Sequence, residues 1–157
     1  MHVCLKGIIF FNLCFNPLTS VNVEAASKTL APHDVTFWVF EDKLRKYGLD
    51  DIHQKDAEFN PLDHSQISYN LTESVIWIKF KIPDQSVSEL YLELSASTIH
   101  FLDFFYPYDS GRYRQISTGF LRNYYTRPIL SDRYVFPVEN PGWHYIRLES
   151  GHFLNTD

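Results

Sequence analysis

Alternation of apolar and polar side chains is the feature that most limits what this chain can fold into. It is clearest in residues 74–82, where Ile76, Ile78, Phe80 and Ile82 alternate with Trp77, Lys79 and Lys81. A period of two residues places the first set on one face of a β-strand and the second set on the other face. No rhythm of strands alternating with helices is present, which argues against a parallel α/β sheet.

Further strand-like segments follow the same logic and are separated by turn sequences such as Asp109-Ser110-Gly111 and Asn140-Pro141-Gly142. Besides 74–82 they are 35–40, 90–94, 100–106, 113–117, 134–138 and 143–150. One short helical segment is expected within residues 49–55. About seven or eight short strands of this spacing predict an all-β fold, a two-sheet antiparallel sandwich of the jelly-roll type.

The N-terminus has the order of a secretory signal peptide. Lys6 precedes an apolar run over residues 8–15, and the small side chains of Val23 and Ala25 suit a cleavage site. We therefore expect a signal peptide over residues 1–25, export of the chain, a lead-in over 26–34, the sandwich over 35–150 and a truncated C-terminal tail over 151–157. An uncleaved membrane anchor and a buried N-terminal strand or helix are the alternatives.

Charge and cysteine content exclude several classes of function. The net charge is −5 with scattered basic residues, so no face concentrates the positive charge that nucleic acid requires. Both cysteines, Cys4 and Cys14, lie within the expected signal peptide. The mature chain would then have no disulfide, thiolate zinc site or cysteine nucleophile. The seven histidines are dispersed, and no nucleotide-binding or metalloprotease motif is present. We expect no cofactor, no metal site and no enzymatic activity.

Paired carboxylates are the one pattern that leaves catalysis open. Glu89, Glu93, Asp103 and Glu149 lie on or beside predicted strands, and two of them in one cleft would suit a jelly-roll glycoside hydrolase. Strand carboxylates mostly face solvent, so this is the weaker hypothesis.

Aromatic and basic residues on the predicted strands favour ligand binding. Trp77 and Lys79 share a strand face, and Tyr91 would join them if the two strands pair, giving a platform for a sugar ring. Tyr125 and Arg127 lie in an irregular segment, where a guanidinium could hold a carboxylate or hydroxyls. The competing interpretations are that Trp77 is a core residue and that Arg127 caps backbone carbonyls.

The motifs together resemble one family. The run 74–80, Phe104-Phe105-Tyr106-Pro107, Arg127-Pro128, the strand 134–138 and Tyr145-Ile146-Arg147-Leu148 resemble, in order, elements of the extracellular sensor domain, second type, of bacterial seven-transmembrane receptors with diverse intracellular signalling modules. The resemblance covers residues 35–150.

This resemblance implies a periplasmic domain that binds a small polar or carbohydrate-like ligand. In relatives the signal would pass to a seven-helix membrane region and a kinase or cyclase output. A secreted carbohydrate-binding module is the alternative function.

Overall fold

The computed structural model describes residues 7–12, 25–26, 35–62, 73–83, 90–95, 99–109 and 111–150. Most of the expected lead-in, the expected tail over 151–157 and Glu89 lie outside these residues. So does the proposed cleavage-site residue Val23.

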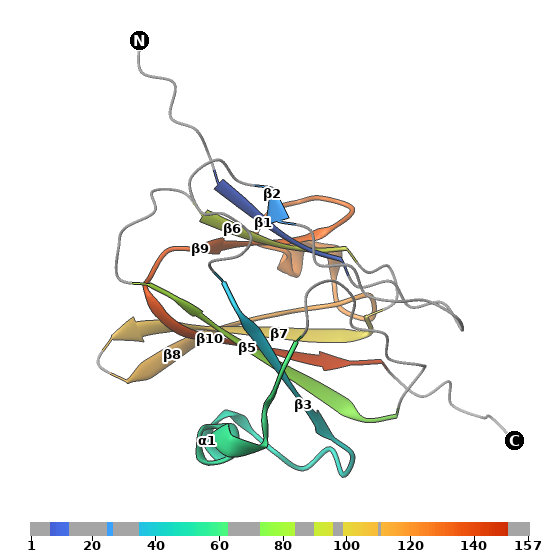
Figure 1. Cartoon of the computed structure of the whole chain (residues 1–157). Coiled ribbons are helices and arrows are strands. Elements are labelled where there is room, and N and C mark those ends of the chain that lie inside the picture. The colour runs from blue at the N-terminus through green and yellow to red at the C-terminus, as the bar shows by residue number, and fades with distance from the viewer. Residues whose placement is uncertain are drawn as a thin grey trace, which may run out of the picture.

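Two β-sheets pack face to face (Figure 1). The four-stranded sheet has the order β2 (Ala25–Ala26), β1 (Gly7–Asn12), β6 (Leu90–Ser95), β9 (Tyr134–Val138). The six-stranded sheet has the order β4 (Asn60–Pro61), β3 (Phe37–Asp42), β5 (Val75–Ile82), β10 (Gly142–Glu149), β7 (Phe101–Asp109), β8 (Arg112–Thr118). The helical segments are α1 (Leu49–Gln54), η2 (Asp56–Glu58) and η3 (Tyr124–Thr126).

The predicted all-β sandwich is confirmed. Each of the seven predicted strands is present within a few residues of its expected bounds, and the one short α-helix falls within residues 49–55 as expected. Pairing is antiparallel except between β1 and β6, which run parallel with Ile8 opposite Tyr91. The apolar run of the expected signal peptide thus contributes a strand in this chain, and the jelly-roll type stays a prediction.

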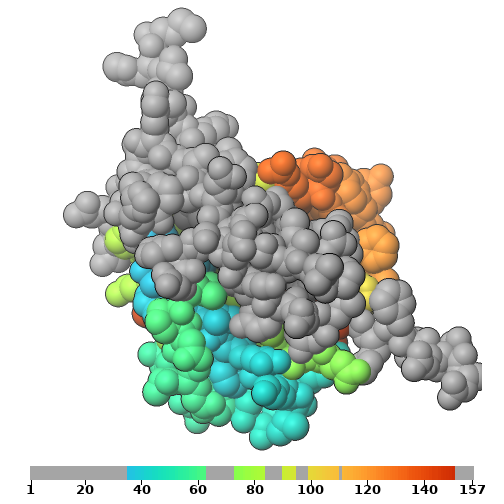
Figure 2. Space-filling view, turned by 45° about the vertical axis from the view of Figure 1, so that its right-hand side comes forward, coloured from blue at the N-terminus to red at the C-terminus, as the bar shows by residue number. Residues whose placement is uncertain are grey.

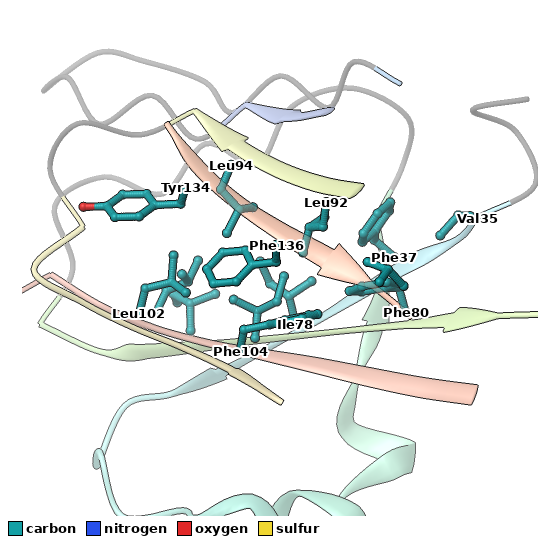
Figure 3. Close-up of a cluster of buried hydrophobic side chains, with 14 of the residues drawn as sticks. Val35, Phe37, Ile78, Phe80, Leu92, Leu94, Leu102, Phe104, Tyr134 and Phe136 are labelled. Carbon is teal, nitrogen blue, oxygen red and sulfur yellow. The ribbon is translucent and has the colours of Figure 1, made fainter. Parts of the chain in front are cut away.

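A continuous apolar core fills the space between the two sheets (Figure 3). Alternation explains its composition, since each strand directs every second side chain inward. Burying one such leucine or phenylalanine stabilises the fold by about 1.5–3 kcal/mol. The fully enclosed members include Ile78, Phe80, Leu92, Leu94, Leu102, Phe104, Phe136 and Ile146.

His144 is a polar member of this interior. Its side chain is fully buried on β10, and its ring stacks on Phe80 at 5.0 Å and on Phe104 at 5.8 Å between centroids. Nδ1 lies 3.1 Å from the Gly142 carbonyl oxygen, which fits a neutral ring with its proton on Nδ1. Burial lowers the pKa of His144 to about 4, with the Gly142 carbonyl partly opposing the shift.

Gly119 determines the path of the chain as it leaves β8. Its φ is +141°, and a Cβ there would lie 2.3 Å from the His100 carbonyl oxygen. The following amides of Phe120 and Leu121 donate to the carbonyls of Ile99 and His100 at 2.7 and 3.2 Å. Only glycine allows the chain to pass this close to the start of β7.

The face of the six-stranded sheet that points away from the four-stranded sheet is called the outer face here. Helix α1 and the η2 segment lie against it (Figure 1). In Figure 2 the cyan-to-green segment 35–62, which contains them, forms the lower part of the visible surface. Within the described residues, no helix has the length and apolar character needed to cross a membrane.

Candidate functional site

Side chains of five strands form regular rows on the outer face. Residues that lie opposite one another in an antiparallel sheet project from the same face. One row runs Trp38, Lys79, Tyr145, Phe105, Gln115, and the next runs Phe40, Trp77, Arg147, Asp103, Ser117. The predicted pair Trp77 and Lys79 therefore stands at the centre of this face.

An apolar cluster distinct from the main core joins these rows to the segment that contains α1 and η2. We call it the outer-face cluster. Ile52 of α1 and Phe59, which follows η2, pack into it from that segment. Burial of these two side chains holds the short helical segment on the sheet. The buried members are Ile52, Phe59, Val75, Trp77, Phe105 and Tyr145, with Trp38, Phe40, Tyr47, Leu49, Tyr113 and Trp143 partly buried around them.

Lys79 places a positive charge inside this aromatic surface. Its side chain is only 4% exposed. Its Nζ lies 4.5 Å from the ring centroid of Phe59, 5.0 Å from that of Trp143 and 5.8 Å from that of Trp38. Nζ also forms an ion pair with the carboxylate of Asp56, whose side chain is 71% exposed. Aromatic rings of the sheet and of the segment after η2 thus surround the ammonium, and a largely exposed carboxylate pairs with it.

Two phenols and an imidazole continue the site along β10 and β8. Tyr113 and Tyr145 lie 5.7 Å apart, and the His53 ring of α1 lies 5.2 and 5.0 Å from them. Burial raises the pKa of Tyr145, and neighbouring Tyr113 and Asp56 raise it further. Burial also raises the pKa of Tyr113. Both hydroxyls therefore stay protonated and can act as hydrogen-bond donors.

Trp77 carries an unused donor in the same cluster. Its side chain is fully buried and stacks on Phe105 at 5.7 Å, but its Nε1 has no hydrogen-bond partner among the described residues. Buried polar groups usually have partners, because an unpaired one costs about 1–3 kcal/mol. Trp77 is therefore a core residue of the outer-face cluster that retains an unsatisfied N–H.

The other predicted site residues lie elsewhere. Strands β5 and β6 belong to different sheets, so the pairing that was to bring Tyr91 beside Trp77 does not occur. Tyr91 is half-buried on β6, and Tyr125 is 79% exposed in η3. Of the five predicted residues, only Trp77 and Lys79 therefore lie together on the outer face. The other three lie outside it.

Arg127 lies just after η3 and bonds within its own loop. Its Nη1 donates to the Ser131 carbonyl, and its guanidinium lies 4.8 Å from the Tyr124 ring and 4.5 Å from the Tyr134 ring. Its Nε is buried without a partner among the described atoms. The carbonyl contact is the one expected of a capping role, and the remaining donor leaves room for a ligand contact.

The candidate carboxylates that the structure describes lie on two different sheets. Glu93 lies on β6 of the four-stranded sheet and pairs with Arg133. Asp103 and Glu149 lie on the outer face, and both contact Arg147, at 3.5 and 2.9 Å. Burial alone would raise the pKa of Asp103, but hydrogen bonds from Ser117 and Arg122 outweigh it and lower that pKa. Asp103 therefore stays ionised and is unsuited to act as a general acid.

Several site residues were not predicted from the sequence. Trp38 and Trp143 flank Lys79 because β3 and β10 lie on either side of β5, and Asp56 reaches it from η2. The alternation of β10 already placed Trp143 and Tyr145 on one face, but not which strands lie beside it. No group of three or more metal-ligating side chains occurs in the part of the chain that the structure describes.

Comparison with known families fits this architecture. The sequence model of the family described as 7TMR-DISM extracellular 2 matches residues 34–157. The chain belongs to this family. The 7TMR-DISM extracellular 2 family is an extracellular sensor domain of seven-transmembrane receptors, which confirms the resemblance found in the sequence motifs. Strands β1 and β2 precede the matched residues. No curated protein matches the chain.

Proposed function

We propose that this chain is the periplasmic ligand-sensing domain of a bacterial transmembrane receptor and that it binds a small polar or carbohydrate-like ligand without catalysing a reaction. The observation that carries the proposal is the family match over nearly the whole sandwich. A receptor domain of this kind passes its state to the membrane region, so its ligand must bind two receptor states with different affinity.

The ligand site that the geometry favours is the outer-face cluster around Trp77 and Lys79. Half-buried rings of Trp38 and Trp143 offer apolar faces that suit the C–H face of a sugar. The ammonium of Lys79 supplies a charge-assisted hydrogen bond to hydroxyl or carboxylate oxygen. A protonated phenol on the neighbouring strands adds a directional donor.

Arg127 and Tyr125, which lie in one segment, remain a second proposed location, and Tyr91 stays a separate proposed contact on β6. They lie outside the outer-face cluster, and Arg127 has one buried donor atom without a partner among the described residues. Ligand contact there would require no movement of α1 or η2. A substitution at each location distinguishes the two.

A thermal-shift screen of the chain against sugars, amino acids and carboxylates tests the proposal. A ligand that binds the folded state raises the melting temperature in a saturable way. We expect this shift to disappear in Lys79→Met and to persist in Lys43→Met, since Lys43 is exposed and lies outside the outer-face cluster. Persistence in Lys79→Met with loss in Arg127→Ala would move the site to the second location. No shift by any compound would contradict small-ligand sensing.

We further propose that residues 1–25 are removed on export. The family match begins after β1 and β2, so the matched domain does not include the strand formed by the apolar run. N-terminal sequencing of the exported protein should begin at Ala26, and an intact Met1 in the mature protein would contradict cleavage.

A further inference from the structure

Asp56 and Lys79 form an unequal pair. The ammonium is buried, while the carboxylate that meets it stands largely in solvent. A buried ammonium needs a counter-ion, because transfer of an unpaired charge from water is very costly. An exposed carboxylate gains little from such a pair, since water solvates it almost as well. The site therefore demands an anion at Lys79 but does not depend on Asp56 to supply it.

The segment that carries Asp56 is held on the sheet by side-chain packing, by the pairing of β4 with β3 and by the ion pair with Lys79. Helix α1 has only six residues, which is too short to be stable by itself. The segment contributes the buried side chains Ile52 and Phe59 to the outer-face cluster, and Asp56 adds the ion pair with Lys79. An anion that replaces Asp56 would remove one of these attachments.

Hydrogen-bond donors that could serve a ligand lie under the same segment. The Nε1–H of Trp77 is buried and has no partner in the described part of the chain. The hydroxyls of Tyr113 and Tyr145 are hydrogen-bonded to each other, which leaves one phenol donor for a ligand, and both rings adjoin the His53 ring of α1. Independently of the ion pair, the unsatisfied indole points to a ligand that brings hydrogen-bond acceptors.

Taken with the aromatic rings, these features define the chemistry of the ligand. A carboxylate would occupy the position of Asp56 on Lys79, and the rings of Trp38 and Trp143 would face a flat or cyclic body. Ring hydroxyls would supply acceptors to the indole and phenol donors. A sugar acid combines all three properties.

We propose that Asp56 holds the place of a ligand carboxylate on Lys79, and that the ligand is a sugar acid whose binding displaces Asp56 and loosens the α1–η2 segment. This inference rests on the proposed ligand-sensing function and specifies its ligand class. The internal carboxylate lowers the apparent affinity in proportion to the fraction of time that it occupies Lys79.

Calorimetric titration with glucuronate, and with glucose as the neutral analogue, tests the displacement. Wild-type protein should bind glucuronate and not glucose. If Asp56 occupies Lys79 for nine-tenths of the time, Asp56→Asn should bind glucuronate about tenfold more tightly, because the competitor is gone. Lys79→Met should bind neither sugar. Asp50→Asn and Lys43→Met are matched controls that change an exposed charge of the same sign and should bind as the wild type does.

Folding of the variants is checked separately. Asp56→Asn leaves Lys79 without its carboxylate and should lower the melting temperature, and glucuronate should restore it in a saturable way. The double variant Asp56→Asn, Lys79→Met removes both charges and should be more stable than Asp56→Asn alone. A double variant no more stable than Asp56→Asn would show that the pair does not matter, and would overturn the inference.

Hydrogen exchange adds a direct readout of the segment. Amides of α1 should exchange faster when glucuronate is bound, while those of β5 stay protected. Equal binding of glucuronate and glucose, or unchanged affinity in Asp56→Asn, would refute the displacement but leave ligand sensing intact. Absence of any binder in the wider thermal-shift screen would instead contradict the proposed function itself.

Discussion

The buried imidazole of His144 should make the stability of this domain depend on pH in a defined range. The ring lies between Phe80 and Phe104 in the main core, and Nδ1 donates to the Gly142 carbonyl. Its Nε2 is buried and has no hydrogen-bond partner among the described residues. Protonation there would create an unpaired charge among apolar side chains, so the fold retains the neutral ring.

The magnitude follows from the two pKa values. In the unfolded chain a histidine binds its proton near pH 6.5, whereas burial lowers the pKa of His144 to about 4 in the fold. Between these values the unfolded state binds the proton and the folded state does not, so the free energy of unfolding falls as the pH falls. At about 1.4 kcal/mol per pH unit, the loss grows to about 3 kcal/mol near pH 4 and then stops.

Urea denaturation at a series of pH values from about 7.5 to 4, for wild type and His144→Phe, measures this term. The phenylalanine keeps an aromatic ring in the stack but cannot titrate. It loses the bond to Gly142, which costs about 1 kcal/mol at every pH. The stability of the wild type should therefore decline more steeply than that of the variant. Asp103 and other carboxylates titrate in both proteins, so they cancel in the difference. Parallel curves for the two proteins would refute the assignment of a neutral, buried His144.

Three further predictions concern stability. Gly119→Ala should destabilise the fold by more than about 2 kcal/mol, because the new Cβ would meet the His100 carbonyl at 2.3 Å and φ is +141°; a change below about 0.5 kcal/mol in urea denaturation would contradict this. Asp103→Asn should lower the free energy of unfolding by about 2–3 kcal/mol, since it removes the buried charge that pairs with Arg122 at 2.7 Å. This difference from the wild type should shrink as the pH falls below about 3.8. A difference that stays constant with pH would be inconsistent with a carboxylate whose pKa is lowered in the fold. Trp77→Phe should cost less than about 2 kcal/mol, because the lost N–H has no partner in the described structure, and a loss above about 3 kcal/mol would show that this donor is paired.

The strands could be predicted from the sequence because each depends on local alternation. In β5 and β10 the inward set of side chains is the one that the pattern assigned to a single face, and it fills the core. Alternation does not say how deeply the opposite set is covered. Trp77 and Lys79 were expected on an accessible face, but α1 and η2 bury both, and the exposed member of the set is Lys81.

The candidate site could be predicted only in part, because strand order is a non-local property. Strands β5 and β6 follow each other closely in the sequence and yet lie in different sheets, which separates Tyr91 from Trp77. Strand β10 comes from the end of the domain and lies beside β5, which brings Tyr145 opposite Lys79. No periodicity within a segment contains this information, whereas the register of the paired strands fixes it completely.

The two faces of the six-stranded sheet are covered differently, and this difference would let the proposed ligand act without unfolding the domain. The inner face is closed by the second sheet, and opening it would expose the whole apolar core. The outer face is covered by a short segment that is held by Ile52, Phe59, the ion pair of Asp56 and the pairing of β4 with β3. Opening that segment exposes far less apolar surface than global unfolding does, so its free energy lies at the low end of the local stabilities in the domain. A ligand that displaced this segment would therefore leave intact the core that fixes the strands.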